Sequence, residues 1–167
     1  MKDKEKQENY ALAEKLLSEQ NFAAAIIAGA TAALLAALGY GITVSVWPVF
    51  YGFAAAGVGL IVGLAMGFLG RGIEAKFTVL AVTYTVIGCV LGNVFMQVLN
   101  VARATRTSPL DVLQAQPPSI LAEWLVSGLS LVHAIYWLVA VVCAGFLAKR
   151  PLSRADRLAL GLYQVRD

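Results

Sequence analysis

Four long apolar stretches constrain the fold of this chain more than any other feature of its sequence. They cover Phe22–Val46, Trp47–Leu69, Phe77–Leu99 and Leu121–Ala148, and none contains lysine, arginine or aspartate. Each has the roughly 20 apolar residues that a helix needs to cross a hydrocarbon core about 30 Å thick. Lipid offers no water to backbone groups, so such segments must bond internally as α-helices. The sequence therefore predicts an all-α polytopic membrane protein, with four transmembrane helices packed as an antiparallel bundle.

The composition agrees with this class. Hydrophobic residues make up 59% of the chain and charged residues 14%, against about 25% charged residues in a typical soluble domain. The net charge of +3 does not indicate nucleic acid, because no basic patch is interleaved with aromatic side chains as a single-strand binder needs. We expect the lipid bilayer as a partner and no nucleic acid.

Lysine and arginine are distributed unequally between the two sides of the predicted bundle. The N-terminal segment 1–21, the loop between the second and third spans, and the tail 149–167 hold 11 of the 13, whereas the opposite side holds Arg103 and Arg106. Cytoplasmic loops carry the excess of positive charge in membrane proteins. We therefore expect an amphipathic cytoplasmic segment 1–21, a transmembrane domain 22–148 and a basic cytoplasmic tail 149–167.

Capping signals predict short helices outside the spans. Residues 5–20 place apolar side chains on one face, as in a helix lying on a membrane surface. Ser108, followed by Pro109 and Asp111, is typical of a helix start, as is Ser153 with Asp156 three residues on. Each such helix could dock a partner or rest on lipid headgroups.

Cys89 and Cys143 fall at different depths of two predicted spans. Counted from the cytoplasmic ends they lie about 18 and 8 Å deep at 1.5 Å per residue, which is unfavourable for a disulfide with Cα atoms at most about 7 Å apart. With one histidine and no CxxC or HxxxH spacing, the chain assembles no zinc or haem ligand set. We expect no metal and no cofactor.

Small residues recur every fourth position along three of the spans. Lipid tails are as apolar as leucine, so no hydrophobic force drives helices together in a membrane. Glycine and alanine instead let helix backbones approach closely and pack. We predict that the rows of the first two spans pack against each other, or that the second row contacts another subunit. The packing residues are Gly29, Ala33 and Ala37, then Gly59, Gly63 and Gly67, then Gly88 and Gly92.

Few polar side chains lie deep in the spans. His133 is the only ionisable one near mid-membrane, and such a residue is a functional candidate by default. His133 and Asn93 lie about 22 and 24 Å from the cytoplasmic ends of their helices, so we predict a hydrogen bond between them. Thr85 lies on the face of the third span that is expected to contact protein. A structural neutral histidine, a proton relay or ligand site, and a contact with a partner chain all remain open.

The loop Gly70–Phe77 is the most motif-like stretch of the chain. Its glycines allow a tight turn, and Arg71 with Lys76 is suited to hold a phosphate or a lipid headgroup. A turn that simply follows the distribution of positive charge explains the same residues equally well. Because no strand precedes it, the loop is neither a dinucleotide-binding fingerprint nor a P-loop.

The same loop carries a resemblance to a known group of proteins. Gly70-Arg71-Gly72-Ile73 with Lys76-Phe77, followed by Gly-Cys-Val-Leu-Gly-Asn at 88–93, resembles the GxGI…KF turn and GCxLGN stretch of small uncharacterised bacterial multi-helix integral membrane proteins. The similarity covers residues 22–100, although Thr78 stands where the pattern has glycine. It implies a bacterial cell inner membrane and a shared unit of the second and third spans, and it implies no chemistry.

Three classes of function fit these features. The leading hypothesis is a non-enzymatic membrane subunit that scaffolds, stabilises or regulates a larger complex, in contact with other membrane subunits or with copies of itself. The second is a small oligomeric transporter or ion or lipid conduit that uses His133, Asn93 and the threonine face. The third is an intramembrane enzyme with a cluster of Glu123, Asp111, Arg103 and Arg106 at the outer face. It lacks any acid–base or nucleophile pair of diagnostic spacing, so we expect no enzymatic activity.

The charge distribution predicts which positions of the chain react with an external thiol reagent in intact cells. In a chain whose native cysteines have been replaced, a cysteine at position 107 should react with a membrane-impermeant thiol reagent, because that loop lies outside. A cysteine at position 160 should stay unlabelled until the cells are opened. The reverse pattern would contradict the orientation.

Overall fold

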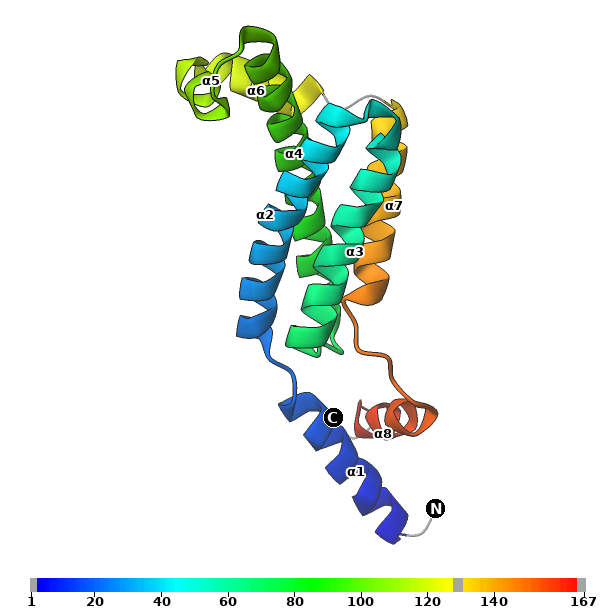
Figure 1. Ribbon diagram of the computed structural model, residues 1–167. Coiled ribbons are helices and arrows are strands. Elements are labelled where there is room, and N and C mark those ends of the chain that lie inside the picture. The colour runs from blue at the N-terminus through cyan, green and yellow to red at the C-terminus, as the bar shows by residue number, and fades with distance from the viewer. Residues whose placement is uncertain (1–2, 128–130, 165–167) are drawn as a thin grey trace.

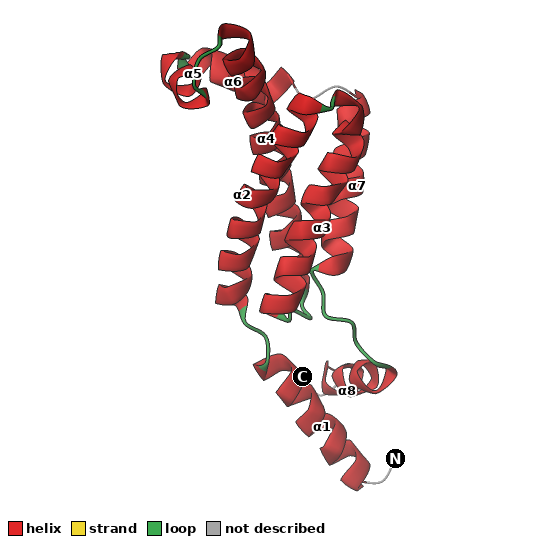
Figure 2. Ribbon diagram, viewed as in Figure 1, coloured by secondary structure: helices red, strands yellow, loops and turns green. Residues whose placement is uncertain are grey.

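The computed structural model describes residues 3–127 and 131–164, and these residues form helices and connections without any strand (Figure 2). The all-α prediction is confirmed for this part of the chain. Helices α2 (Phe22–Val46), α3 (Tyr51–Gly70), α4 (Ala75–Thr105) and α7 (Leu131–Leu147) pack side by side as a bundle (Figure 1). The elements outside the bundle are α1 (Asp3–Ser18), the 3-10 turn η1 (Pro48–Phe50), α5 (Pro109–Ala115), α6 (Pro118–Ser127) and α8 (Arg154–Gln164).

Helices α2 and α7 occupy opposite corners of the bundle. Each packs against both α3 and α4, and the backbones of α2 and α7 are not in contact within the described part of the chain. Helices α1 and α8 lie together beyond one end of the bundle, whereas α5 and α6 lie at the other end, beside α4 (Figure 1). The first and last described helices are therefore on the same side of the bundle.

Among the described residues, three helical segments are long and apolar enough to cross a membrane: α2, the continuous stretch Pro48–Gly70 and α4. The fourth predicted span, Leu121–Ala148, needs a correction. Its first part belongs to α6, which packs against α4 rather than continuing the line of α7 (Figure 1), and residues 128–130 lie outside the described chain. Helix α7 has 17 residues, the lower limit of about 17 for a membrane-spanning helix.

Side-chain caps set several helix starts where the sequence predicts them. The Oδ1 atom of Asn21 accepts a hydrogen bond of 2.9 Å from the backbone N–H of Ala24, which begins α2. Ser108 accepts from the first backbone N–H groups of α5. Ser153 and Asp156 bond reciprocally, with each backbone N–H donating to the other side chain, and this capping box begins α8. The predicted short helices are confirmed.

The glycine row of α3 faces α7, not α2, which corrects the predicted pairing of the first two rows. A Cβ atom added at Gly63 would lie 2.9 Å from the Cα atom of Ala144. A Cβ atom added at Gly59 or Gly67 would collide with a carbonyl oxygen of α7. The row that was a candidate interface with another subunit is thus covered within the same chain. Spacing identifies a small face, but it does not say which helix covers it.

The small residues of α2 and α4 bring these two helices together. Gly29, Ala33 and Ala37 are buried, and a Cβ atom at Gly29 would lie 2.6 Å from the ring of Tyr84 on α4. At Gly88 the nearest atoms would belong to Val58 and Ala33, and at Gly92 to the Tyr40 ring. Glycine on one helix therefore accommodates a bulky side chain or the backbone of its neighbour.

The contact between α3 and α7 predicts the effect of filling it. Gly63→Leu should lower the free energy of unfolding by about 1–3 kcal/mol, the usual cost of overpacking, measured as a lower melting temperature in detergent. Gly57→Leu is the matched control, since no atom outside the local helix lies within 4 Å of a Cβ there. Equal melting temperatures for the two variants would contradict the assigned faces.

Candidate functional site

A cluster of polar aromatic side chains lies in the half of the bundle remote from the chain ends. It consists of Tyr40 on α2, Tyr51 on α3, and His133 with Trp137 on α7. The rings of Tyr40 and Tyr51 meet edge to face with centroids 5.5 Å apart, and the His133 ring lies over Tyr51 with centroids 3.9 Å apart. We call these four side chains the polar cluster.

The polar cluster contains buried polar atoms whose hydrogen bonds are not fully formed. Within the described part of the chain, the hydroxyl groups of Tyr40 and Tyr51 and the indole N–H of Trp137 are buried and interact only with one another, without a hydrogen bond of good geometry. A buried polar group without a partner costs about 1–3 kcal/mol, so it calls for a structural or functional explanation. A small polar ligand or ordered water with two or more bonding partners would meet this need.

His133 and Asn93 take different partners from the predicted one. The Nδ2 atom of Asn93 donates a hydrogen bond of 3.1 Å to the carbonyl oxygen of Trp124 on α6, and no hydrogen bond joins it to His133 among the described residues. The prediction assumed one straight fourth span. Because α6 and α7 are separate helices, the backbone of α6 comes to lie beside Asn93, while His133 packs on Tyr51.

Thr85 is fully buried, and its hydroxyl group has no hydrogen-bond partner among the described residues. Threonine in a helix commonly bonds the carbonyl group one turn back, as Thr83 does to Val79 at 2.9 Å. Helix α4 therefore contains one threonine that bonds its own backbone, Thr83, and one that does not, Thr85. Thr85 adds one more polar atom to the apolar interior.

These two threonines give a matched test. Replacing Thr85 by the isosteric valine removes a buried unsatisfied hydroxyl group and should raise the free energy of unfolding by about 1 kcal/mol. Thr83→Val, which removes a satisfied hydroxyl group on the exposed side, should bring no such gain. Thermal unfolding in detergent measures both. A lower melting temperature for Thr85→Val would show that its hydroxyl group makes a bond that the native state depends on.

The loop after α3 is held by contacts within the chain. Lys76 forms a salt bridge of 3.0 Å with Glu74, and Arg71 lies 3.6 Å from the carboxylate of Glu19. Arg71 takes the left-handed conformation with φ 48°, while a Cβ atom at Gly72 would collide with the ring of Phe77. Both residues predicted to contact a headgroup are thus paired with carboxylates.

A network of hydrogen bonds joins the beginning, middle and end of the chain at this loop. The Glu19 carboxylate accepts a hydrogen bond of 2.6 Å from Arg150, and the Arg150 backbone N–H donates to Gly72 O at 2.9 Å. The Asn21 backbone N–H donates to Gly70 O at 2.9 Å. We call Glu19–Asn21, Gly70–Glu74 and Arg150 the junction. It fixes α1 and the approach to α8 on the bundle.

The junction predicts a dependence on pH. The hydrogen bond from Arg150 holds the pKa of the Glu19 carboxyl below its ordinary value of 4.5. The ion pair of Glu19 with Arg150 therefore contributes fully to the stability of the junction above pH 4.5, and this contribution is lost as the pH falls through the lowered pKa. The protection factors of the α1 amides, which compare the exchange rate with the intrinsic rate at the same pH, should fall at acidic pH in the wild type. Glu19→Gln should show these low protection factors already at pH 7, and protection that varies with pH in this variant as it does in the wild type would contradict the assignment.

Comparison of the chain with family models, curated proteins and solved structures finds no match. Among the described residues, no three histidine, cysteine, aspartate or glutamate side chains gather as a group able to hold a metal ion. Cys89 is buried and Cys143 half-buried, both as free thiols. Function is therefore inferred from the geometry of the molecule.

Proposed function

We propose that this chain is a non-enzymatic integral membrane subunit that scaffolds, stabilises or regulates a larger membrane complex. In this proposal α2, the stretch Pro48–Gly70, α4 and α7 each cross the inner membrane of a bacterium. Both chain ends lie in the cytoplasm, because lysine and arginine concentrate at the end of the bundle that carries α1 and α8.

Close packing along the bundle is the observation that carries this proposal. Glycines of α3 meet the backbone of α7, and a Cβ atom at Gly41 of α2 would lie 2.7 Å from Phe95 of α4. Tyr40, Met66 and Phe77 are among the large side chains that fill the space between these contacts. Helices packed this closely favour a structural role over a path for solutes through a single chain.

Helices outside the bundle supply surfaces for partners on both sides of the membrane. Helices α1 and α8 pack through buried Ala13, Leu16 and Ala159, and the Tyr10 and Tyr163 rings meet with centroids 6.4 Å apart. On the opposite side, α5 packs on α4 through Val112 and its apolar neighbours. These helices hold folded surfaces beyond the membrane, where other subunits can bind.

The polar cluster favours a second candidate, a small oligomeric transporter or conduit. Buried hydroxyl groups beside an ionisable ring are typical of polar sites within membranes. In this alternative a path forms between copies of the chain, and His133 with Tyr51 lines it. His133→Gln would then abolish proton or solute flux in proteoliposomes while the protein still folds.

Isolation from the native membrane in mild detergent separates these functions. We expect a partner of fixed stoichiometry by mass spectrometry, lost on Ala159→Glu because a charge there separates α1 from α8. Ala155→Glu, on the exposed side of α8, is the matched control and should retain the partner. A chain that purifies without any partner and supports flux that depends on His133 would overturn the scaffold proposal in favour of the transporter.

A further inference from the structure

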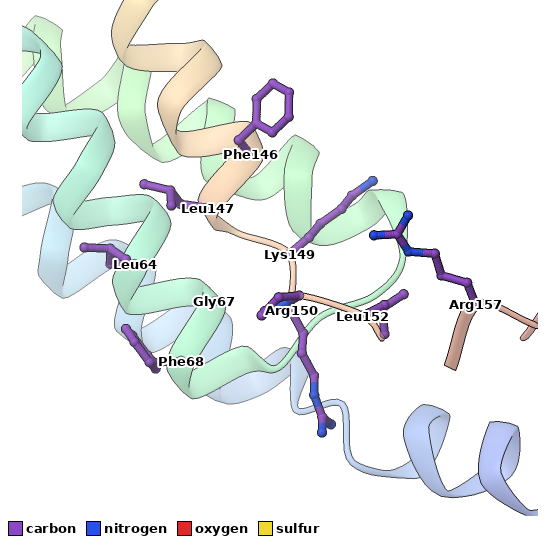
Figure 3. A pocket seen from close by; sticks show the side chains of 10 residues that line it. Leu64, Gly67, Phe68, Phe146, Leu147, Lys149, Arg150, Leu152 and Arg157 are labelled. Atoms are coloured by element: carbon purple, nitrogen blue, oxygen red, sulfur yellow. The ribbon is translucent and has the colours of Figure 1, made fainter. Parts of the chain in front are cut away.

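A cleft opens on the outside of the bundle where α3, α7 and the approach to α8 meet (Figure 3). Its volume is about 580 Å³. Its apolar wall comes from Leu64 and Phe68 on α3 and from Phe146 on α7, and its rim from Lys149 and Arg157. The cleft thus combines an apolar wall with a basic edge.

The rim carries positive charge that is not neutralised locally. Arg150 points away from the cleft toward α1 (Figure 3), where its guanidinium group bonds Glu19. Salt bridges among the described residues hold Arg71, Lys76 and Arg150, but none holds Lys149 or Arg157. Of the three basic residues that line the cleft, Lys149 and Arg157 are therefore available to bind an anion from outside the chain.

The position of the cleft matches the boundary between hydrocarbon and headgroups. Its wall belongs to the last two turns of α3 and the last turn of α7. Of its rim, Lys149 follows closely after α7 ends at Leu147, and Arg157 comes from α8. Phe68 and Phe146 are 78% and 82% exposed, so their rings need an apolar covering. In the proposed orientation this boundary faces the cytoplasm, where basic pockets between helices bind anionic lipid headgroups.

We propose that this cleft binds an anionic glycerophospholipid. The phosphate lies between Lys149 and Arg157, and an acyl chain runs along Leu64, Phe68 and Phe146. Because Arg157 belongs to α8 and Lys149 follows α7, the bound lipid ties α8 to the bundle. The proposal rests on the membrane orientation given above. The lipid would strengthen an attachment of α8 that the hydrogen bonds of the junction already provide.

Native mass spectrometry of the purified full chain tests this binding. With phosphatidylglycerol and phosphatidylcholine added in turn, we expect the anionic lipid to bind at least tenfold more tightly. The double variant Lys149→Gln/Arg157→Gln should lose at least fivefold of that affinity. The control Lys15→Gln/Arg154→Gln removes the same charge from exposed positions at the same end and should keep it, and melting temperatures verify that both variants fold.

Three results would overturn the proposal: equal binding of the two lipids, equal loss in both double variants, or displacement of the lipid by millimolar inorganic phosphate. The last would identify a site for free phosphate instead. Lipid binding is counted on the isolated chain, whereas the scaffold proposal is tested by capture of a partner through α1 and α8. A failure of one therefore leaves the other measurable.

Discussion

The contact between the glycine row of α3 and the backbone of α7 underlies most of this architecture. Helix α7 has only 17 residues, and in the proposed membrane setting lipid would provide no hydrophobic force to hold it against its neighbours. Gly59, Gly63 and Gly67 remove the side chains that would keep the two backbones apart. Once α7 is seated, its first turns bring His133 and Trp137 to the polar cluster, and its end places Lys149 and Arg150 beside the junction.

Much of the fold follows from local sequence, because local forces decide it. An apolar run bounded by Asn21 and Trp47 gives α2 its observed ends, and capping residues set the starts of α5 and α8. The pairing of helices does not follow in this way, since a small face of α3 suits any neighbour that offers a smooth surface. The division of Leu121–Ala148 into two helices likewise depends on the packing of α6 against α4, through Asn93 and Trp124.

The candidate sites were only partly predictable. His133 is identified by its charge chemistry, but Tyr40, Tyr51 and Trp137 resemble ordinary aromatic residues of membrane helices until the fold places their polar atoms together. The distribution of basic residues predicts the side of the membrane and says nothing about their pairing. Glu19 and Arg150 are 131 positions apart, so the structure was needed to show that Arg150 is neutralised and Lys149 is not.

The junction also has a consequence for the order of biosynthesis. Glu19 and Gly72 leave the ribosome early, whereas Arg150, which bonds both, is made only after the bundle helices that precede it. A chain interrupted before that point leaves the Glu19 carboxylate and the Gly72 carbonyl group without this partner. The bond between Asn21 and Gly70 can therefore form early in synthesis, whereas the bonds of Glu19 and Gly72 to Arg150 can be added only after the bundle helices have been made.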